Sequence, residues 1–340
     1  MTTATETGRG TKISWYRTPI SRDLLNELNQ RSDWRGLLQT VGFLGVLTLT
    51  GAVAWFASVR LSWPWFLLAL LAHGTVYGFV INGFHELCHR TVFRTRWLNA
   101  FFLNIYSFIG WYNPVLFWAS HSAHHKYTLH PPDDLEVVLP TKLRLKDYLK
   151  FALVNPWRLG TTMKRVIRHC RGRVEEGWNT SLFPPDDRVG RRRLFRFDRF
   201  LLVGHAAIAA VSLYSGHWQP IVLITLGSFY GGWLFFLCNT TQHIGLSDQV
   251  TDFRLCTRTI LLGPFVGFLY WHMHYHIEHH MYAAVPCYRL KRLHQAVAHD
   301  LPPCSRGLVA NWRQIIAILR RQRSDPGYQF VPELPSRNPG

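Results

Sequence analysis

Two pairs of long apolar segments, each pair flanked by Arg-rich polar chain, most constrain how this sequence can fold. Residues 36–59 carry no charge and lie between Arg35 and Arg60. A helix of that length can cross the ~30 Å hydrocarbon layer of a bilayer. A second apolar segment follows after a turn at Leu61-Ser62 and continues through Phe84, and residues 200–217 and 220–240 form a second pair. The pattern predicts an all-α integral membrane protein with four transmembrane helices arranged as two hairpins.

The distribution of basic residues predicts the orientation of these hairpins. The two connecting turns contain almost no Lys or Arg, whereas the N-terminal, middle and C-terminal regions are rich in Arg. Because cytoplasmic loops carry an excess of Lys and Arg, we expect a multi-pass protein with both termini in the cytoplasm. The formal net charge of +18 has the same explanation, so we do not expect nucleic acid as a partner.

Two further apolar runs, residues 97–118 and 259–271, are predicted to be interfacial or re-entrant helices. The first run is interrupted by polar residues and a proline, and the second is too short to span a bilayer comfortably. If the first run crossed the membrane, the histidine-rich segments before and after it would lie on opposite faces. With four spans, those segments lie on one face.

The positions of the polar regions suggest that the chain has three parts. We predict a cytoplasmic N-terminal segment at 1–35, a membrane domain at 36–300 and a cytoplasmic C-terminal tail at 301–340. The polar regions at 131–199 and after 281 are expected to form a helical cytoplasmic cap. Within it, the Pro-Pro-Asp-Asp and Arg-rich stretch at 184–193 is interpreted as a loop.

Half of the 18 histidines fall into compact groups. His85-Glu-Leu-Cys-His89 has i, i+4 spacing, which on a helix places both imidazoles on one face, close enough to bind one metal ion. His121-Ser-Ala-His124-His125 and His276-Ile-Glu-His279-His280 carry three histidines each, and Asn239-Thr-Thr-Gln-His243 follows the fourth apolar segment. Neutral imidazole binds iron, copper, nickel or zinc. Because eight or nine such ligands are too many for one ion, the groups predict a dinuclear metal site.

These histidine groups, in their order and in their placement after paired apolar segments, resemble the histidine boxes of the membrane fatty acid desaturase and hydroxylase family. The resemblance covers about residues 36–300. It is most specific at Tyr275–His280, followed by Met281-Tyr282 and Val285-Pro286, and at His121–His125, followed by Thr128 and Asp133-Asp134. It implies a di-iron centre, with two iron ions per chain, held by His85, His89, His121, His124, His125, His243, His276, His279 and His280, with Asn239 acting through a water molecule.

Two features depart from the family pattern. The first histidine group has three intervening residues where many members have four. His272 and His274 also stand where related sequences often show Asn, so either could orient a ligand. Metal-bound imidazoles commonly donate their second N–H to a carboxylate, and the acidic candidates for that role are Glu86, Asp133, Asp134, Asp252 and Glu278.

The other histidines are interpreted as structural. His73 and His205 lie within apolar segments and are expected to be packing residues. Ordinary polar positions are expected for His130, His169, His217, His294 and His299. No substrate-binding residue is predicted, because small and aromatic residues in the spans are equally well explained by helix packing.

The resemblance implies an oxidoreductase that uses O2 on an acyl chain or another lipid-like substrate. A desaturase is favoured, and a hydroxylase or ketolase built on the same metal core is the alternative. The chain contains no His-Pro-Gly-Gly haem element and no GxGxxG following a strand. We therefore expect electrons from a separate ferredoxin or cytochrome with its reductase, attracted by the basic cytoplasmic face.

Two other functions stay open from the residues alone. His85–His89 also fits HExxH, the zinc-protease signature in which the glutamate activates a metal-bound water, and here it ends an apolar segment. A catalytic zinc site uses three protein ligands, which would leave most of the clustered histidines unused. A metal transporter or sensor is the second alternative. Transporters place ionisable ligands within spans, whereas these groups lie at span ends.

Overall fold

The computed structural model describes residues 12–141 and 143–336, and most of these are helical. The predicted all-α class is confirmed, with one parallel two-stranded pair of β1 (Ile260–Leu261) and β2 (Ser305–Arg306) in addition. Residues 1–11 of the predicted N-terminal segment and 337–340 of the predicted C-terminal tail lie outside the described residues.

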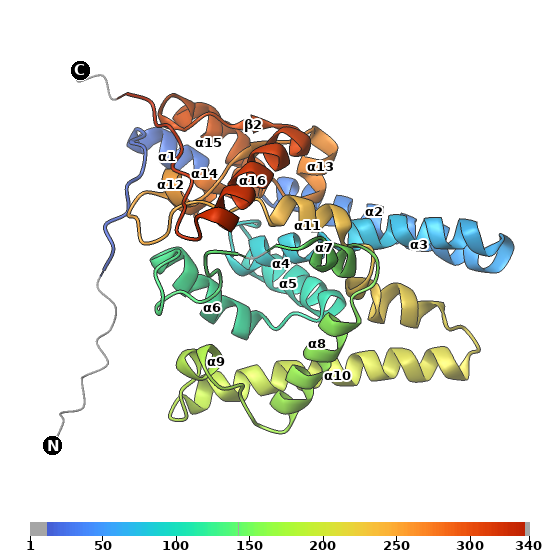
Figure 1. The fold of residues 1–340 in the computed structure, drawn as a ribbon. Coiled ribbons are helices and arrows are strands. Elements are labelled where there is room, and N and C mark those ends of the chain that lie inside the picture. The colour runs from blue at the N-terminus through green and yellow to red at the C-terminus, as the bar shows by residue number, and fades with distance from the viewer. Residues whose placement is uncertain (1–11, 142, 337–340) are drawn as a thin grey trace.

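The helices α2 (Asp33–Arg60) and α3 (Trp63–Tyr77) form a long hairpin that projects from the rest of the molecule (Figure 1). Ser32 caps α2 by accepting the Arg35 N–H. The helix α3 begins after Ser62, with Pro64 in its first turn. After a bend, the chain continues as α4 (Val80–Cys88). In the described part of the chain, two helices, Asp33–Arg60 and Trp63–Cys88, are long and apolar enough to cross a membrane. The first predicted hairpin therefore exists as a pair of long helices.

The second predicted hairpin is less regular than expected. α10 (Arg188–Tyr214) begins within the stretch interpreted as a loop, because Asp187 caps it by accepting the Gly190 N–H. The predicted continuous helix at 220–240 was wrong: the chain forms a π-helical turn η1 (Ile221–Thr225), a 3-10 turn η2 (Gly227–Phe229) and α11 (Trp233–Asn239).

The break before α11 has a local cause. Gly231 has a φ of +68°, and a Cβ placed on it would lie 2.7 Å from the backbone of Gly74 in α3. Only glycine allows both that backbone conformation and so close an approach to a neighbouring helix. The four membrane spans therefore remain a prediction. Among the described residues, two helices are long and apolar enough to cross a membrane.

The two apolar runs interpreted as single interfacial helices are both interrupted. Residues 97–118 form α5 (Arg96–Gly110) and the start of α6 (Pro114–Tyr127), because Trp111 is left-handed and Asn113 caps α6 by accepting the Val115 and Leu116 N–H groups. Residues 259–271 form β1 and the six-residue α13 (Pro264–Leu269), separated by Gly263.

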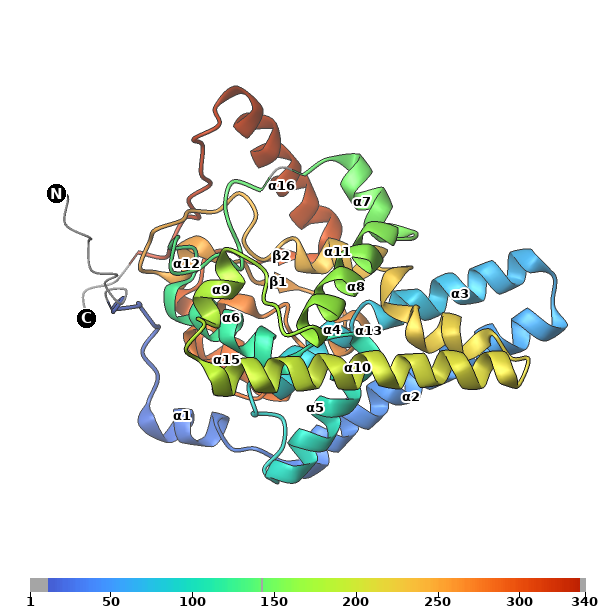
Figure 2. The ribbon, with the colours of Figure 1, turned by 90° about the horizontal axis from the view of Figure 1, so that it is seen from below.

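Most other helices gather at the end of the molecule opposite the tip of the α2–α3 hairpin, while α10 extends in the same direction as the hairpin with η1 between them (Figures 1 and 2). A buried core of aromatic residues, including Phe43, Phe84, Tyr106 and Trp271, joins α2, α4, α5 and the segment after α13. The remaining elements are α1 (Arg22–Leu28), α7 (Leu145–Ala152), α8 (Pro156–Cys170), α9 (Trp178–Leu182), α12 (Phe253–Cys256), α14 (His276–Met281), η3 (Cys287–Arg289), α15 (Leu290–Val297), η4 (Ala298–Asp300) and α16 (Gly307–Ser324).

Candidate metal centre

The nine histidines predicted as metal ligands come together from four separate stretches of chain. His85 lies in the last turn of α4 and His89 directly follows that helix, α6 supplies three imidazoles from its last two turns, and α14 supplies three more. His243 follows α11 in a short turn. Helical spacing explains the convergence, since residues three and four apart share one face.

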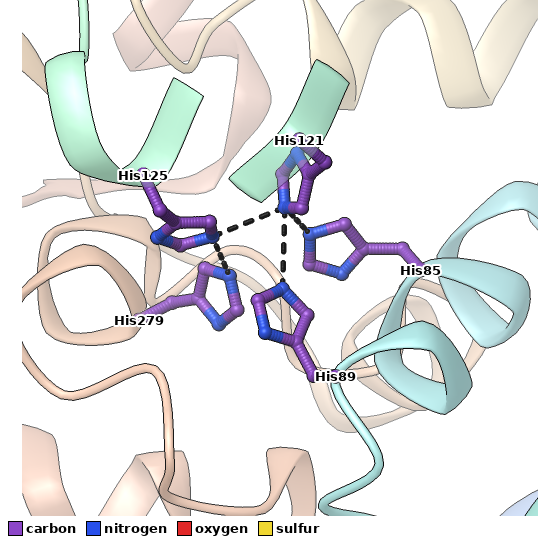
Figure 3. A group of neighbouring side chains, drawn as sticks. All are labelled: His85, His89, His121, His125 and His279. Carbon is purple, nitrogen blue, oxygen red and sulfur yellow. Dashed lines mark hydrogen bonds between the residues drawn. The ribbon is translucent and has the colours of Figure 1, made fainter. Parts of the chain in front are cut away.

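Five of these imidazoles form one compact group, which Figure 3 shows pointing toward a common centre. His121 Nε2 lies 2.7 Å from His85 Nε2, 3.2 Å from His89 Nε2 and 3.0 Å from His125 Nε2. His279 Nε2 is 3.1 Å from His125 Nε2. All ligand nitrogens of this five-histidine group lie within 4.8 Å of one another; its members are His85, His89, His121, His125 and His279.

The remaining imidazoles form a second, adjacent group. Ligand nitrogens of His124, His243 and His280 lie within 4.8 Å of one another. His276 Nε2 joins them, at 3.0 Å from His243 Nε2 and 3.2 Å from His280 Nε2. We call these residues the four-histidine group. The two groups together have the ligand number and the donor type suited to two transition-metal ions.

Acceptors on the outer nitrogens determine how several of these rings are oriented. His85 Nδ1 donates to Glu86 Oε1 over 3.0 Å, and His121 Nδ1 donates to Glu136 Oε1 over 2.8 Å. In the four-histidine group, His124 Nδ1 donates to Asp134 Oδ2 over 2.8 Å, and the His243 ring donates to a backbone carbonyl over 2.9 Å. Such partners fix the tautomer of a metal-binding imidazole and raise its basicity.

This tautomer assignment has a direct chemical consequence. Because Nδ1 carries the proton in both His85 and His121, each Nε2 presents a lone pair, and the two lone pairs face each other across 2.7 Å. Two lone pairs this close repel unless a cation lies between them. The donor set therefore fits a metal ion, and it does not fit a network of ordinary hydrogen bonds.

Burial also favours the neutral, metal-binding form of the imidazoles. It lowers the pKa of His243 to about 3, and with neighbouring imidazoles it holds the pKa values of His125 and His279 well below their usual range. His124 differs: burial acts to lower its pKa, but the hydrogen bond to Asp134 and the negative charges of Glu136 and Asp134 together outweigh burial, and the net shift of the pKa is upward.

Of the five predicted acidic partners, two contact the metal-site imidazoles. Glu86 and Asp134 do so as described above. Asp133 makes no contact with the nine imidazoles in the described structure, Asp252 caps α12 and pairs with Arg254, and Glu278 bonds Thr259 and His294. In the described structure, none of these three carboxylates forms a hydrogen bond with the nine imidazoles.

Glu136 is the partner that sequence reasoning missed. It follows Asp134 by two residues in the same loop, and its second oxygen accepts the Ser120 hydroxyl over 2.8 Å. Asp134 and Glu136 are two residues apart and contact different histidines of α6, His124 and His121. The second acid two residues after Asp134 was the sequence signal that could have identified Glu136.

Asn239 and several histidines outside the two groups lie in surroundings that differ from those expected from the sequence. Asn239 ends α11 with an exposed side chain. His272 and His274 contact each other, with ring centroids 6.1 Å apart, and none of the nine imidazoles in the described structure. His169 is not an ordinary polar residue, because it is fully buried between Asp198 and Glu175.

The two histidines in apolar segments behave as packing residues. His73 lies 3.0 Å from both the Thr50 hydroxyl and the Leu223 carbonyl oxygen. His205 stacks on Trp111 with centroids 3.9 Å apart. Both rings have their polar atoms paired, as buried polar groups require.

Aromatic rings border the five-histidine group on two sides. Phe117 stacks on His121 with centroids 4.8 Å apart and touches Phe84, so an apolar wall adjoins the ligands. Trp118 meets the His89 ring edge-on at 5.4 Å, and 42% of the Trp118 surface is exposed. The predicted ligand His89 is thus in van der Waals contact with an aromatic ring at the protein surface.

Comparison with known proteins identifies one family. The family model described as fatty acid desaturase matches residues 61–309, a range that contains all nine histidines. The sn-1 oleoyl-lipid 12-desaturase of Arthrospira platensis is 24% identical over 320 residues, which cover 80% of this chain and 80% of that protein.

Proposed function

Because this chain belongs to the fatty acid desaturase family, we propose that it is a membrane-bound di-iron enzyme that uses O2 to introduce a double bond into an acyl chain. Membership makes it an iron-dependent oxidoreductase of lipid metabolism. The observation that carries the finer proposal is the pair of adjacent imidazole groups, each with its Nε2 lone pairs converging on one point.

We assign one iron ion to the five-histidine group and one to the four-histidine group. Bound iron would supply an oxidant strong enough to remove hydrogen from an unactivated C–H bond. The chain's own residues hold the imidazoles in place: Glu86 and Glu136 orient the first group, and Asp134 and the Cys256 carbonyl orient the second. Asn239 is left out of the proposed ligand set because its side chain is exposed.

The proposed substrate is an acyl chain carried on a membrane lipid. The relative from Arthrospira platensis is named for desaturation of an oleoyl lipid, and the same kind of substrate suits a site next to long apolar helices. The wall formed by Phe84 and Phe117 beside the ligands is apolar, as an alkyl substrate requires. Hydroxylation or ketolation on the same core is the competing outcome.

Electrons are proposed to come from a separate acidic carrier protein. The net charge of +18 would attract such a partner and accelerate its encounter. Trp118 provides an exposed ring in contact with the ligand His89, and we place electron entry there. Both termini and the metal centre are proposed to lie on the cytoplasmic side.

The geometry disfavours the zinc-protease alternative. In that chemistry the glutamate of HExxH acts on water bound to the metal, so its carboxylate has to reach the metal-facing side of the histidines. Here Glu86 Oε1 accepts from the outer nitrogen of His85 and lies 3.8 Å from the outer nitrogen of His279. A group of five histidines also exceeds the three ligands of catalytic zinc.

Expression in a bacterial host of defined lipid composition, followed by mass spectrometry of its lipids, tests the proposed reaction. We expect acyl chains that have lost two hydrogen atoms, and none in cells that express His124→Ala. Acyl chains that instead gain one oxygen atom would make the enzyme a hydroxylase. Unchanged lipids, with an iron-loaded protein and a competent electron carrier present, would contradict the proposal.

A further inference from the structure

A cavity lies away from the metal centre, on the flank of the α2–α3 hairpin. It has a volume of about 710 Å³ and is an open groove bordered by α2, α3, η1 and Ile109 of α5. Its wall includes Leu47, Ala52, Phe56 and Leu223, and Arg60 stands at the end of α2 beside it. The volume falls in the range of ligand-binding pockets, which are about 300–1,000 Å³.

The few polar groups in this wall are paired within the protein. The ring nitrogens of His73 bond the Thr50 hydroxyl and the Leu223 carbonyl, each at 3.0 Å. The Tyr77 hydroxyl lies 2.9 Å from the Ile109 carbonyl oxygen and 2.8 Å from the Ile224 carbonyl oxygen. Because these polar atoms are already satisfied, the interior offers a ligand apolar surface, which suits a hydrocarbon chain.

The irregular backbone of η1 shapes this cavity and is itself held by side chains. Three consecutive carbonyl groups of the π-helical turn, at Leu223, Ile224 and Thr225, are bonded by His73, Tyr77 and Trp111 respectively. Backbone that leaves the helical pattern at membrane depth persists where it is buried in protein or lines a cavity, and π-helical turns often occur at functional sites. Side chains from two other segments thus maintain the turn that forms one wall.

The two ends of the cavity differ. Tyr77 lies at the end toward the metal centre, since α3 runs from Trp63 at the hairpin tip toward α4 and His85. A Cβ on Gly227 would meet the Tyr77 ring at 2.2 Å, so this end is tightly packed. At the other end, Phe56 and Val59 are more than half exposed and Arg60 is exposed. The cavity is therefore open at the hairpin tip, and the exposed Thr48 and Ala52 show that it is also open along α2.

We propose that this cavity binds one acyl chain of an anionic phospholipid, with the phosphate against Arg60, as a resident lipid separate from the substrate. A guanidinium pairs well with phosphate oxygens, and the apolar interior accepts the chain. The proposal rests on the proposed membrane arrangement of α2 and α3, and it does not depend on the reaction at the metal centre.

Lipid retention by the purified protein tests the proposal without reference to activity. The protein is purified in detergent with its metal in place and incubated with equal amounts of phosphatidylglycerol and phosphatidylcholine before native mass spectrometry. We expect one retained phosphatidylglycerol per chain. Ala52→Phe fills the cavity and should weaken retention at least ~10-fold, since each buried methylene contributes about 0.8 kcal/mol. Arg60→Gln should reduce the preference for phosphatidylglycerol about fivefold.

Matched variants control for general effects on the hairpin. Val53 is next to Ala52 and exposed, but does not line the cavity, so Val53→Phe should leave retention unchanged. Arg35→Gln removes a comparable exposed cation at the other end of the membrane-crossing part of α2 and should leave the lipid preference unchanged. Thr48→Phe offers a second way to fill the cavity if Ala52→Phe fails to fold.

Three results would overturn the proposal. The first is equal retention by the wild type and a folded cavity-filling variant. The second is an unchanged preference for phosphatidylglycerol in Arg60→Gln. The third is a cavity-filling variant that changes which chain lengths are desaturated, because the cavity would then hold the end of the substrate. Failure of the proposed desaturase activity alone, with lipid retention as expected, would leave this cavity assignment standing.

Discussion

The imidazole rings of His125 and His280 stack with their centroids 4.6 Å apart and their planes inclined by 30°. His125 belongs to the five-histidine group on α6, and His280 belongs to the four-histidine group on α14. This contact joins the two groups directly, so ions bound in them would be close neighbours. A pair of adjacent ions can share the reduction of one O2 molecule, which a pair of distant sites could not do.

Replacing Glu136 by Gln should weaken iron binding although Glu136 is not a ligand. The carboxylate accepts the His121 Nδ1 proton over 2.8 Å, and loss of such a partner typically reduces metal affinity about 10–100-fold. Iron retained after dialysis against a graded series of chelator concentrations measures this effect. Asp133→Asn is the control, because it lies in the same loop without contact to the imidazoles, and an equal loss in both variants would show that Glu136 has no specific role.

Gly83→Ala should destabilise the protein and disturb the first histidine pair. A Cβ at this position would lie 2.3 Å from a ring carbon of Tyr106 and 2.6 Å from one of Trp271, both fully buried. Overpacking of this kind costs about 1–3 kcal/mol, and the strain falls two residues before His85. Thermal unfolding and iron content measure the result. Gly45→Ala meets nothing within 4 Å and should leave both unchanged or slightly improved; similar losses in the two variants would refute the packing argument.

The buried His169 should make stability fall as pH rises. Burial acts to lower the pKa of His169, but hydrogen bonds to Asp198 and Glu175 outweigh it, and its pKa in the folded protein is raised. The stabilisation is therefore fully present below the unfolded pKa of about 6.5 and is lost as pH rises through the folded pKa. Within that window the free energy of unfolding should fall by up to about 1.4 kcal/mol per pH unit.

The difference between wild type and His169→Gln isolates this contribution from other titrating groups. We expect the stability difference between the two proteins, measured by thermal unfolding in detergent, to shrink above about pH 6.5. A difference that stays constant up to pH 9 would mean that His169 is not held as an ion pair.

Reduction of the metal centre by an acidic carrier should depend on salt and on Trp118. Screening shortens the range of charge attraction to about 10 Å at 0.1 M salt, so the second-order rate should fall as salt increases. Trp118→Leu should slow reduction while leaving iron content unchanged, since Trp118 contacts His89 through its ring edge and is not a ligand. Stopped-flow spectroscopy records both effects, and rates insensitive to salt would rule out electrostatic docking.

The sequence predicted the histidine groups well because their spacing encodes their geometry. His85 and His89, or His121 and His125, fall on one helical face whatever surrounds them, so local periodicity sufficed. The acidic partners were predicted less well. Glu136 and Glu278 are both acids near histidine groups, and only the path of the loop after α6 decides that Glu136 reaches His121 while Glu278 turns to His294.

The long helices were predicted better than the irregular ones for a related reason. Hydropathy over 36–59 identifies α2 without further information, whereas the break before α11 depends on contact between Gly231 and Gly74 in another helix. The capping of α10 by Asp187 moved its start into a stretch whose composition is typical of loops. His169 looked ordinary because Asp198 is 29 residues away in sequence, and Glu175, six residues away, lies beyond the end of α8 and does not share a helical face with it.

Iron content per chain tests the central assignment most directly. The purified protein, reconstituted with ferrous iron without O2 and measured by plasma mass spectrometry, should hold about two iron ions per chain, from the ligand count of the two groups. His279→Ala should lose iron from the five-histidine group, and His243→Ala from the four-histidine group, so each should fall toward one ion. A wild-type protein that binds a single zinc ion in preference to iron, or variants that retain the full iron content, would contradict the account.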